Sequence, residues 1–166
     1  RNADVMQTAL EAGASIINDI TALTGSGALD VAAASGASVI LMHMQGSPAT
    51  MQDDPRYDAV VSDIFDWLAT RVAACVQAGI SLDRIAVDPG FGFGKTLAHN
   101  VALLTDLGRF HGLGCALAVG LSRKSFLGTL GGEEDPAARV VSSVTAALDA
   151  VGRGAQILRV HDVVET

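Results

Sequence analysis

The chain has 166 residues, of which 49% are hydrophobic and 17% are charged, and its formal net charge at pH 7 is −7. This length favours one domain with a buried core, and the composition excludes intrinsic disorder. The acidic balance argues against nucleic acid as a partner, because phosphate binding needs a basic surface.

The two cysteines, Cys75 and Cys115, lie far apart and lack the spacing of a metal site or a disulfide framework. They indicate buried thiols in a reducing compartment, so we expect the protein in the cytoplasm. No uncharged apolar run approaches the roughly 18 residues of a membrane span, and we therefore expect no membrane partner.

Short apolar runs recur along the chain, and each ends in polar or glycine-rich residues. They lie at residues 15–17, 38–42, 85–87, 117–119 and 157–160. Because the runs do not alternate with polar residues, they are typical of strands buried on both faces. The sequence therefore predicts a parallel sheet.

Helical patterns fill the gaps between these runs. The clearest covers residues 59–78, and shorter ones cover 3–11, 28–34 and 100–107. Asp135 and Pro136 form a helix-start signal, because a capping carboxylate precedes a proline at the first helical position. In the helix that follows, the residues expected to form the buried stripe are Val140, Val141, Val144, Leu148 and Val151.

Nearly every predicted strand delivers a polar residue at its C-terminal end, which favours a barrel over an open doubly wound sheet. A (β/α)8 barrel needs eight strands and about 250 residues. Since about five strands are predicted, we expect an α/β fold: a (β/α)8 TIM barrel in an N-terminally truncated form. Residues 1–166 would then be a single, partial barrel domain.

The glycine-rich segment 88–96 fails both nucleotide-binding patterns. Only three residues separate Gly90 from Gly94-Lys95-Thr96, whereas a phosphate-binding loop needs four. Two interpretations of Asp88 remain open: it caps the turn, or it accepts the paired N–H donors of a flat heterocycle.

Two basic segments lie at the ends of the last strands. Ser122-Arg123-Lys124-Ser125 is more typical of an anion or substrate site than of a surface turn. Arg159 and His161 are two residues apart on one strand, so they share a side and predict a diphosphate clamp. The alternative is that Arg159 pairs with a carboxylate inside the barrel.

Asn18 either binds a ring edge or turns the chain, and His43 favours a structural role. No cluster of His, Cys and carboxylate residues has metal-ligand spacing, and no Ser-His-Asp set is found. Hydride transfer has no signature either.

Taken together, five segments resemble dihydropteroate synthase, the folate-pathway family targeted by sulfonamides. In family order, they are residues 16–20, 41–46, 88–95, 120–125 and 159–163. The resemblance implies a transferase that condenses 7,8-dihydropterin-6-ylmethyl diphosphate with 4-aminobenzoate. The products would be dihydropteroate and pyrophosphate.

The resemblance implies a pterin site made from five residues. Asn18 and Asp88 would hold the ring edge, and Met42 would line the apolar wall. Lys124 would contact the ring, while Gly120 would permit close approach of the backbone.

The resemblance also assigns the second substrate and the leaving group. Phe93 and Ser125 would border 4-aminobenzoate, whereas Arg159 and His161 would hold the diphosphate. The expected catalytic residues are therefore Lys124, Arg159 and His161.

Magnesium is the cofactor that the resemblance implies. No metal ligand is expected among these residues, because the family's magnesium-ligating asparagine belongs to an N-terminal part that this chain does not match. We expect the chain alone to be poorly soluble or inactive, since its sheet would have two unpaired edges. The resemblance also implies a homodimer, with residues 137–151 as the candidate interface.

Other functions remain open at this point. A methyltransferase that uses methyltetrahydrofolate would share Asn18 and Asp88 but would have no diphosphate to hold. A non-catalytic pterin-binding module would keep part of the pocket, and an inactive fragment is a further alternative. A nucleotide hydrolase is disfavoured by the short phosphate loop.

Overall fold

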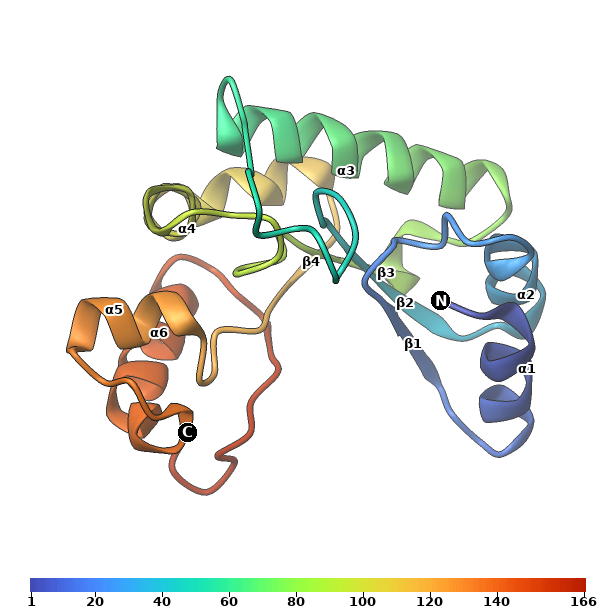
Figure 1. Cartoon of the computed structure of the whole chain (residues 1–166). Coiled ribbons are helices and arrows are strands. Elements are labelled where there is room, and N and C mark those ends of the chain that lie inside the picture. The colour runs from blue at the N-terminus through green and yellow to red at the C-terminus, as the bar shows by residue number, and fades with distance from the viewer.

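The computed structural model describes all residues 1–166 and shows strands that alternate with helices along the chain (Figure 1). The strands are β1 (Ile16–Asp19), β2 (Ser38–Met42), β3 (Ile85–Asp88), β4 (Ala116–Val119) and β5 (Ile157–Leu158). The α-helices are α1 (Ala3–Glu11), α2 (Ala28–Ser35), α3 (Val60–Gln77), α4 (Leu97–Thr105), α5 (Ser125–Gly131) and α6 (Val140–Gly152). Short 3-10 turns cover Leu82–Arg84, Leu107–Leu113 and Pro136–Arg139.

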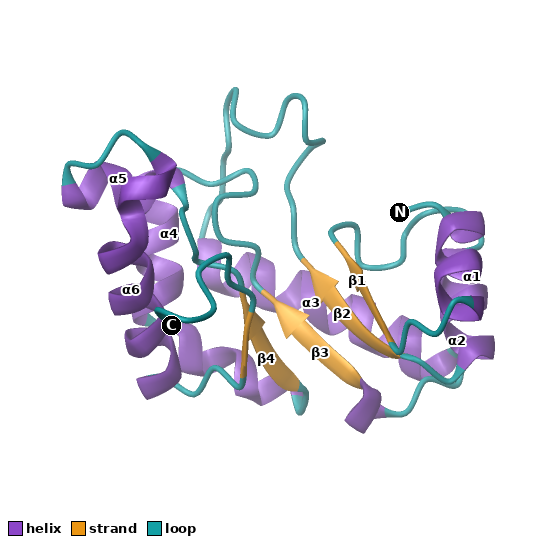
Figure 2. Ribbon diagram, turned by 90° about the horizontal axis from the view of Figure 1, so that it is seen from below, coloured by secondary structure: helices purple, strands orange, loops and turns teal.

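The five strands form one parallel sheet in the order β1-β2-β3-β4-β5. Each strand therefore pairs with the next strand in the sequence, and a helix or loop crosses over between them. Figure 2 shows helices behind and beside the sheet and none in front of it. The sheet with its outer helices is half of a barrel, so the predicted parallel sheet and partial barrel are confirmed.

The two faces of the sheet differ in burial. Ile17 of β1 is 7% exposed, whereas its neighbour Ile16 is 56% exposed because it lies on the inner face. Only β3 has all of its residues buried. The expectation that every strand is buried on both faces is therefore wrong for β1, whose side chains alternate, and for β5, which has no buried residue. The helices cover the outer face alone.

The core lies between the outer face of the sheet and the helices. Helix α3 contributes Ile64, Leu68, Val72 and Cys75, all of which are buried. Burying an aliphatic side chain of this size contributes about 1.5–3 kcal/mol. The core is mainly aliphatic because the chain has few aromatic residues, but Phe91 and Phe110 are among its fully buried side chains. None of the helices combines the length and the apolar character needed to cross a membrane.

Helix α6 buries a different face from the one predicted, although Val140 and Val144 of the predicted stripe are half-buried. Val141 and Leu148, both assigned to the buried stripe, are 77% and 72% exposed. The buried face carries small residues instead, namely Ser143, Ala146, Ala147 and Ala150. Small side chains let the helix lie close to its neighbours, so the large aliphatic residues point outward.

Helix α4 begins three residues before the predicted start at residue 100. Thr96 caps the helix: its hydroxyl accepts the His99 N–H at 3.2 Å, and His99 Nδ1 accepts the Thr96 N–H at 3.2 Å. This is a capping box with histidine in the place usually held by Glu or Gln. Because histidine is not the usual residue of a capping box, the sequence marks the start of α4 less clearly than the structure does.

Candidate functional site

The predicted site residues come together because all five strands run in the same direction. Their C-terminal ends lie at one edge of the sheet, and the loops that follow rise from that edge (Figure 2). Pairing of Met42 with Asp88 fixes the ends of β2 and β3 at the same level. This edge is where barrel enzymes assemble their sites.

Asp88 is the buried acid of this edge, with 6% of its surface exposed. Its carboxylate accepts the Gly90 N–H at 2.7 Å. Burial raises the pKa of Asp88, and the positive charges of Lys124, Lys95 and Arg159 oppose that rise. Asp88 therefore caps its own turn, as the first interpretation expected, and it faces a cationic surrounding, while its binding of a heterocycle stays a prediction.

Lys124 joins the β4–α5 loop to the β3–α4 loop. Its Nζ lies 4.2 Å from the centre of the Phe93 ring, a cation–π contact. Its stem crosses Gly92, where an added Cβ would lie 3.2 Å from Lys124 Cδ. Burial lowers the pKa of Lys124 to about 8, while Asp88 acts in the opposite direction. The two residues predicted for different substrates, Lys124 and Phe93, are thus in direct contact.

Arg159 lies directly against Gly120. An added Cβ at Gly120 would be 2.8 Å from Arg159 Nη2, so glycine leaves space for the guanidinium. In the structure, the group that lies close to the Gly120 backbone is therefore the Arg159 side chain. Arg159 is exposed and forms no ion pair with a carboxylate of this chain, so the alternative role is not observed here and the clamp stays a prediction.

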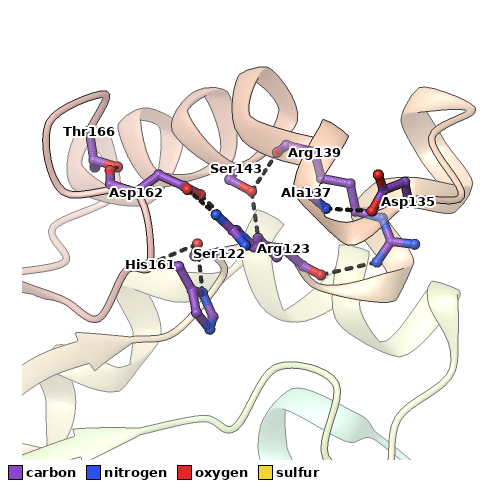
Figure 3. Close-up of polar contacts among 9 residues, drawn as sticks. All are labelled: Ser122, Arg123, Asp135, Ala137, Arg139, Ser143, His161, Asp162 and Thr166. Carbon is purple, nitrogen blue, oxygen red and sulfur yellow. Dashed lines mark hydrogen bonds and ion pairs between the residues drawn. The ribbon is translucent and has the colours of Figure 1, made fainter.

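His161 is held by the loop that follows β4. The Ser122 hydroxyl accepts the main-chain N–H of His161 at 3.2 Å and lies 3.0 Å from His161 Nδ1 (Figure 3). Strand β5 ends at Leu158, so Arg159 and His161 follow the strand rather than belonging to it. Both nevertheless rest on the same segment, 120–122, which brings the two side chains to one place.

Asn18 is exposed at the end of β1, whereas its neighbour Asp19 is 1% exposed. The Asp19 carboxylate accepts the Leu23 N–H at 2.8 Å and the Thr21 hydroxyl at 2.8 Å. These hydrogen bonds outweigh burial and lower the pKa of Asp19. Since Asp19 turns the chain, the Asn18 amide is not needed for that turn.

Met42 and Ser125 occupy different surroundings. Met42 is 3% exposed and lies beneath Gly90, where an added Cβ would be 3.3 Å from Met42 Cγ. Ser125 is exposed at the first position of α5, directly after Lys124. The sheet edge therefore brings together Met42, Asp88, Phe93 and Lys124, while Asn18 lies on the outermost strand.

Residues 1–161 match the profile of the family described as pterin binding enzyme. This chain belongs to the pterin-binding enzyme family. It is 47% identical over 163 residues to dihydropteroate synthase of Escherichia coli (strain K12), covering 98% of this chain and 57% of that relative. The similarity predicted from the five segments is thereby confirmed.

Solved structures agree with the family assignment. A dihydropteroate synthase from Stenotrophomonas maltophilia with imidazole in its active site superposes with a TM-score of 0.97 at 52% identity. The Xanthomonas albilineans enzyme in complex with 7,8-dihydropteroate has a TM-score of 0.92 at 48% identity. Each comparison covers 99% of this chain and 62% of the solved chain. The pterin-binding chain thus spans less than two thirds of the length of these relatives.

Lys95 is a further residue of this strand-end edge that the sequence did not single out. Its Nζ donates to the Phe93 carbonyl at 2.9 Å and lies 3.1 Å from His43 Nδ1. Burial lowers the pKa of Lys95 to about 7. Its only sequence signal is its place directly after the Gly-Phe-Gly segment. The structural role expected for His43 is confirmed by this contact.

The donor set of this pterin-binding chain does not fit a resident metal ion. No group of three or more His, Cys, Asp or Glu side chains is placed to hold one. The charged groups around Asp88 are the cations Lys95, Lys124 and Arg159, which would repel a metal. Magnesium therefore stays a prediction from the sequence, and no chemical step is assigned to it here.

A cavity of about 720 Å³ opens beside the candidate site rather than in it. It lies between the β2–α3 loop and the start of α4, and its lining includes His43, Tyr57, Trp67 and His99. Asp88, Lys124 and Arg159 do not line it. The candidate site is accordingly an open surface formed by strand ends and loops, not this cavity.

Proposed function

We propose that this chain carries a pterin-binding and diphosphate-binding half of dihydropteroate synthase. The observation that carries the proposal is the buried carboxylate of Asp88 surrounded by Lys95, Lys124 and Arg159 from three loops. A pterin presents paired N–H donors to a carboxylate, and a diphosphate needs several positive charges. The X. albilineans relative, solved with 7,8-dihydropteroate, supports this choice of ligand.

The proposed reaction joins two substrates and releases pyrophosphate. The C–O bond between the pterin methylene and the diphosphate breaks, and the leaving group takes the electron pair. The amine nitrogen of 4-aminobenzoate bonds to the methylene carbon and loses one proton to solvent. Preorganised cations stabilise the negative charge that develops on the leaving group, and this chain supplies them as Arg159, His161 and Lys124.

No strong general base is required by this scheme. The electron-rich pterin delocalises positive charge on the methylene carbon, so the weakly basic aromatic amine can attack it. This agrees with the candidate site, in which Asp88 is committed to the ring edge and Asp19 to the turn after β1. Asn18, Met42 and Gly120 complete the pterin surface in this proposal, and Phe93 and Ser125 border the 4-aminobenzoate position.

Calorimetric titration tests the ring and the diphosphate assignments separately. We expect Asp88→Asn to weaken dihydropterin diphosphate and 6-hydroxymethyl-7,8-dihydropterin alike, by about 10- to 100-fold, as for lost charge-assisted hydrogen bonds. Arg159→Ala should weaken only the diphosphate. Asp83→Asn, at an exposed carboxylate outside the site, is the control. Equal losses for both ligands in Arg159→Ala would contradict the clamp.

Pyrophosphate release distinguishes the synthase from the other candidate functions. A synthase releases pyrophosphate only when dihydropterin diphosphate and 4-aminobenzoate are both present. A non-catalytic module or an inactive fragment releases none, and a pterin-dependent methyltransferase does not discriminate between the diphosphate and the bare pterin. This assay should be run on the chain and on Asp88→Asn in parallel.

A homodimer through α6 and a cytoplasmic location are further parts of the proposal. The exposed apolar residues Val141, Leu148 and Val151 on α6 support the first. We expect Leu148→Glu to lower the sedimentation coefficient from that of a dimer to that of a monomer. The free, buried Cys75 and Cys115 support the second, because such thiols persist in a reducing compartment.

A further inference from the structure

Arg123 has a backbone conformation that side-chain-bearing residues seldom adopt, with φ +59°. It stands between Ser122, which contacts His161, and Lys124, which lies over Phe93. The reversed backbone sends these two neighbours to different parts of the candidate site. Such a conformation persists where surrounding groups hold it in place.

The main chain of Arg123 is held from both sides by the junction between the 3-10 turn 136–139 and α6. Its N–H donates to Ser143 Oγ at 2.8 Å, and its carbonyl accepts from Arg139 Nη1 at 3.0 Å (Figure 3). The Ser143 hydroxyl in turn donates to the Arg139 carbonyl at 2.6 Å. Arg139 and Ser143 therefore form a closed set of hydrogen bonds around the main chain of one residue, Arg123.

Arg139 is a buried arginine without a carboxylate partner. It is 8% exposed, and its guanidinium donates to the main-chain carbonyls of Glu133 and Glu134 as well as to that of Arg123. Gly128 leaves space for it, since an added Cβ there would be 2.4 Å from Arg139 Nε. Five N–H donors in a rigid plane suit an arginine for joining three carbonyls, and lysine lacks this geometry.

The side chain of Arg123 extends the set of contacts to the loop after β5. Its guanidinium is paired with both carboxylate oxygens of Asp162, with Nε 3.0 Å from Oδ2. This contact lowers the pKa of Asp162. Because Asp162 follows His161 directly, the ion pair and the Ser122–His161 hydrogen bonds join the same two loops side by side (Figure 3).

We propose that Arg139 and Asp162 are positioning residues that hold Lys124 and His161 in one preformed anion site. Arg139 acts through the Arg123 main chain, and Asp162 acts through the Arg123 side chain. The proposal rests on the proposed function, since the anion is the diphosphate group. The Asp162 side chain is 10% exposed and that of Arg123 is 34% exposed, so thermal melts beside each titration separate an effect on ligand binding from one on the fold.

Two variants and a matched control test the proposal. Asp162→Asn removes the charge of the ion pair, and Arg139→Lys keeps the charge but loses the planar fork. Asp149→Asn removes the Asp149–Arg153 ion pair of α6, whose Oδ2 and Nε are 2.7 Å apart and which lies outside the site. Inorganic pyrophosphate is the probe, titrated calorimetrically into the folded chain, with thermal melts run beside each titration.

A second measurement reports the position of Lys124 without any ligand. The chain has only two lysines, Lys95 and Lys124, so ε-carbon-labelled lysine gives two NMR signals, assigned with Lys124→Arg. The Phe93 ring should shift the Lys124 signal, because Nζ lies 4.2 Å from its centre. Loss of that shift shows that the side chain has left its place.

We expect Asp162→Asn and Arg139→Lys to bind pyrophosphate about 10-fold more weakly and to lose the Lys124 shift. Asp149→Asn and Asp162→Glu should keep both. Unchanged affinity and shift in a folded Asp162→Asn would overturn the proposal. If the unmodified chain binds no pyrophosphate, the proposed function fails, and the Lys124 shift alone decides the positioning. If Arg139→Lys does not fold, the pyrophosphate affinity and the Lys124 shift of Asp162→Asn decide the proposal.

Discussion

Lys95 Nζ lies 3.1 Å from His43 Nδ1, and both side chains are buried, with 4% and 6% of their surfaces exposed. Burial and the nearby Lys95 charge lower the pKa of His43 to about 3, so its imidazole is neutral and accepts a hydrogen bond. The same ammonium donates to the Phe93 carbonyl. One lysine therefore ties the end of β2 to the loop that carries Phe93.

This buried lysine predicts how stability depends on pH. The pKa of Lys95 is about 7 in the folded chain and near 10.5 when unfolded, so above pH 7 the unfolded chain holds the extra proton. The free energy of unfolding should therefore rise with pH, by about 1 kcal/mol between pH 7 and pH 8. Urea denaturation at the two pH values measures this rise. Lys95→Met, which cannot titrate, should flatten it, and an unchanged slope would contradict the prediction.

The edge of the sheet could be predicted from the sequence because a polar residue marks the end of a buried run. Asn18, Asp88 and Gly120 each follow apolar residues, and parallel strands must bring such ends together. Lys95 and Arg139 could not be found in this way. Their partners are main-chain carbonyls and a histidine, which leave no charge pattern in the sequence.

Burial on the inner face of the sheet could not be predicted for a related reason. An apolar residue such as Ile16 contributes the same hydrophobicity to the sequence pattern whether or not another element covers its side chain. The same holds for α6, where alanines face the core and valines face outward. Hydrophobicity alone favoured the larger side chains, whereas the space between helix and sheet admits only the smaller ones.

The orientation of α6 predicts that replacing an alanine by leucine destabilises the protein on the buried face of α6 but not on the exposed face of α3. Ala147 of α6 is 3% exposed, so Ala147→Leu should overpack the core and lower the free energy of unfolding by about 1–3 kcal/mol. Ala73→Leu, on the exposed face of α3, is the matched control and should change it by less than about 0.5 kcal/mol. Equal effects in urea denaturation would mean that the buried face of α6 is wrongly assigned.

Gly90 predicts a large steric effect close to Asp88. Its φ is +73°, and an added Cβ would lie 1.9 Å from the His43 carbonyl oxygen. Gly90→Ala should lower the free energy of unfolding by about 2–5 kcal/mol, from left-handed strain and the clash together. Gly132 has φ +74° with no atom within 4 Å of such a Cβ. Gly132→Ala should therefore show the strain alone, about 1–2 kcal/mol.

The difference between these two glycine variants isolates the close approach of the β3–α4 loop to β2. Chemical denaturation of both variants under one condition gives this difference in the free energy of unfolding directly. Equal losses would show that the loop yields to the extra carbon. They would also remove the reason for a glycine beside the buried carboxylate.

Lys124 predicts how anion binding depends on pH. Burial lowers its pKa to about 8, against the opposing charge of Asp88, so the ammonium loses its proton as the pH rises through this value. The affinity for pyrophosphate should then fall, because one positive charge leaves the site. Arginine keeps its charge over this range and retains the contact with the Phe93 ring, so Lys124→Arg is the matched variant.

The measurement is the ratio of pyrophosphate affinities of the unmodified chain and Lys124→Arg at pH 7 and at pH 9. Pyrophosphate itself gains charge over this range, but that gain affects both proteins and cancels in the ratio. We expect the ratio to fall by about 5- to 10-fold, as for the loss of one titrating cation. A ratio that does not change with pH would mean that Lys124 either keeps its proton or lies outside the anion site. The Lys124 NMR signal, followed over the same pH range, separates these two explanations.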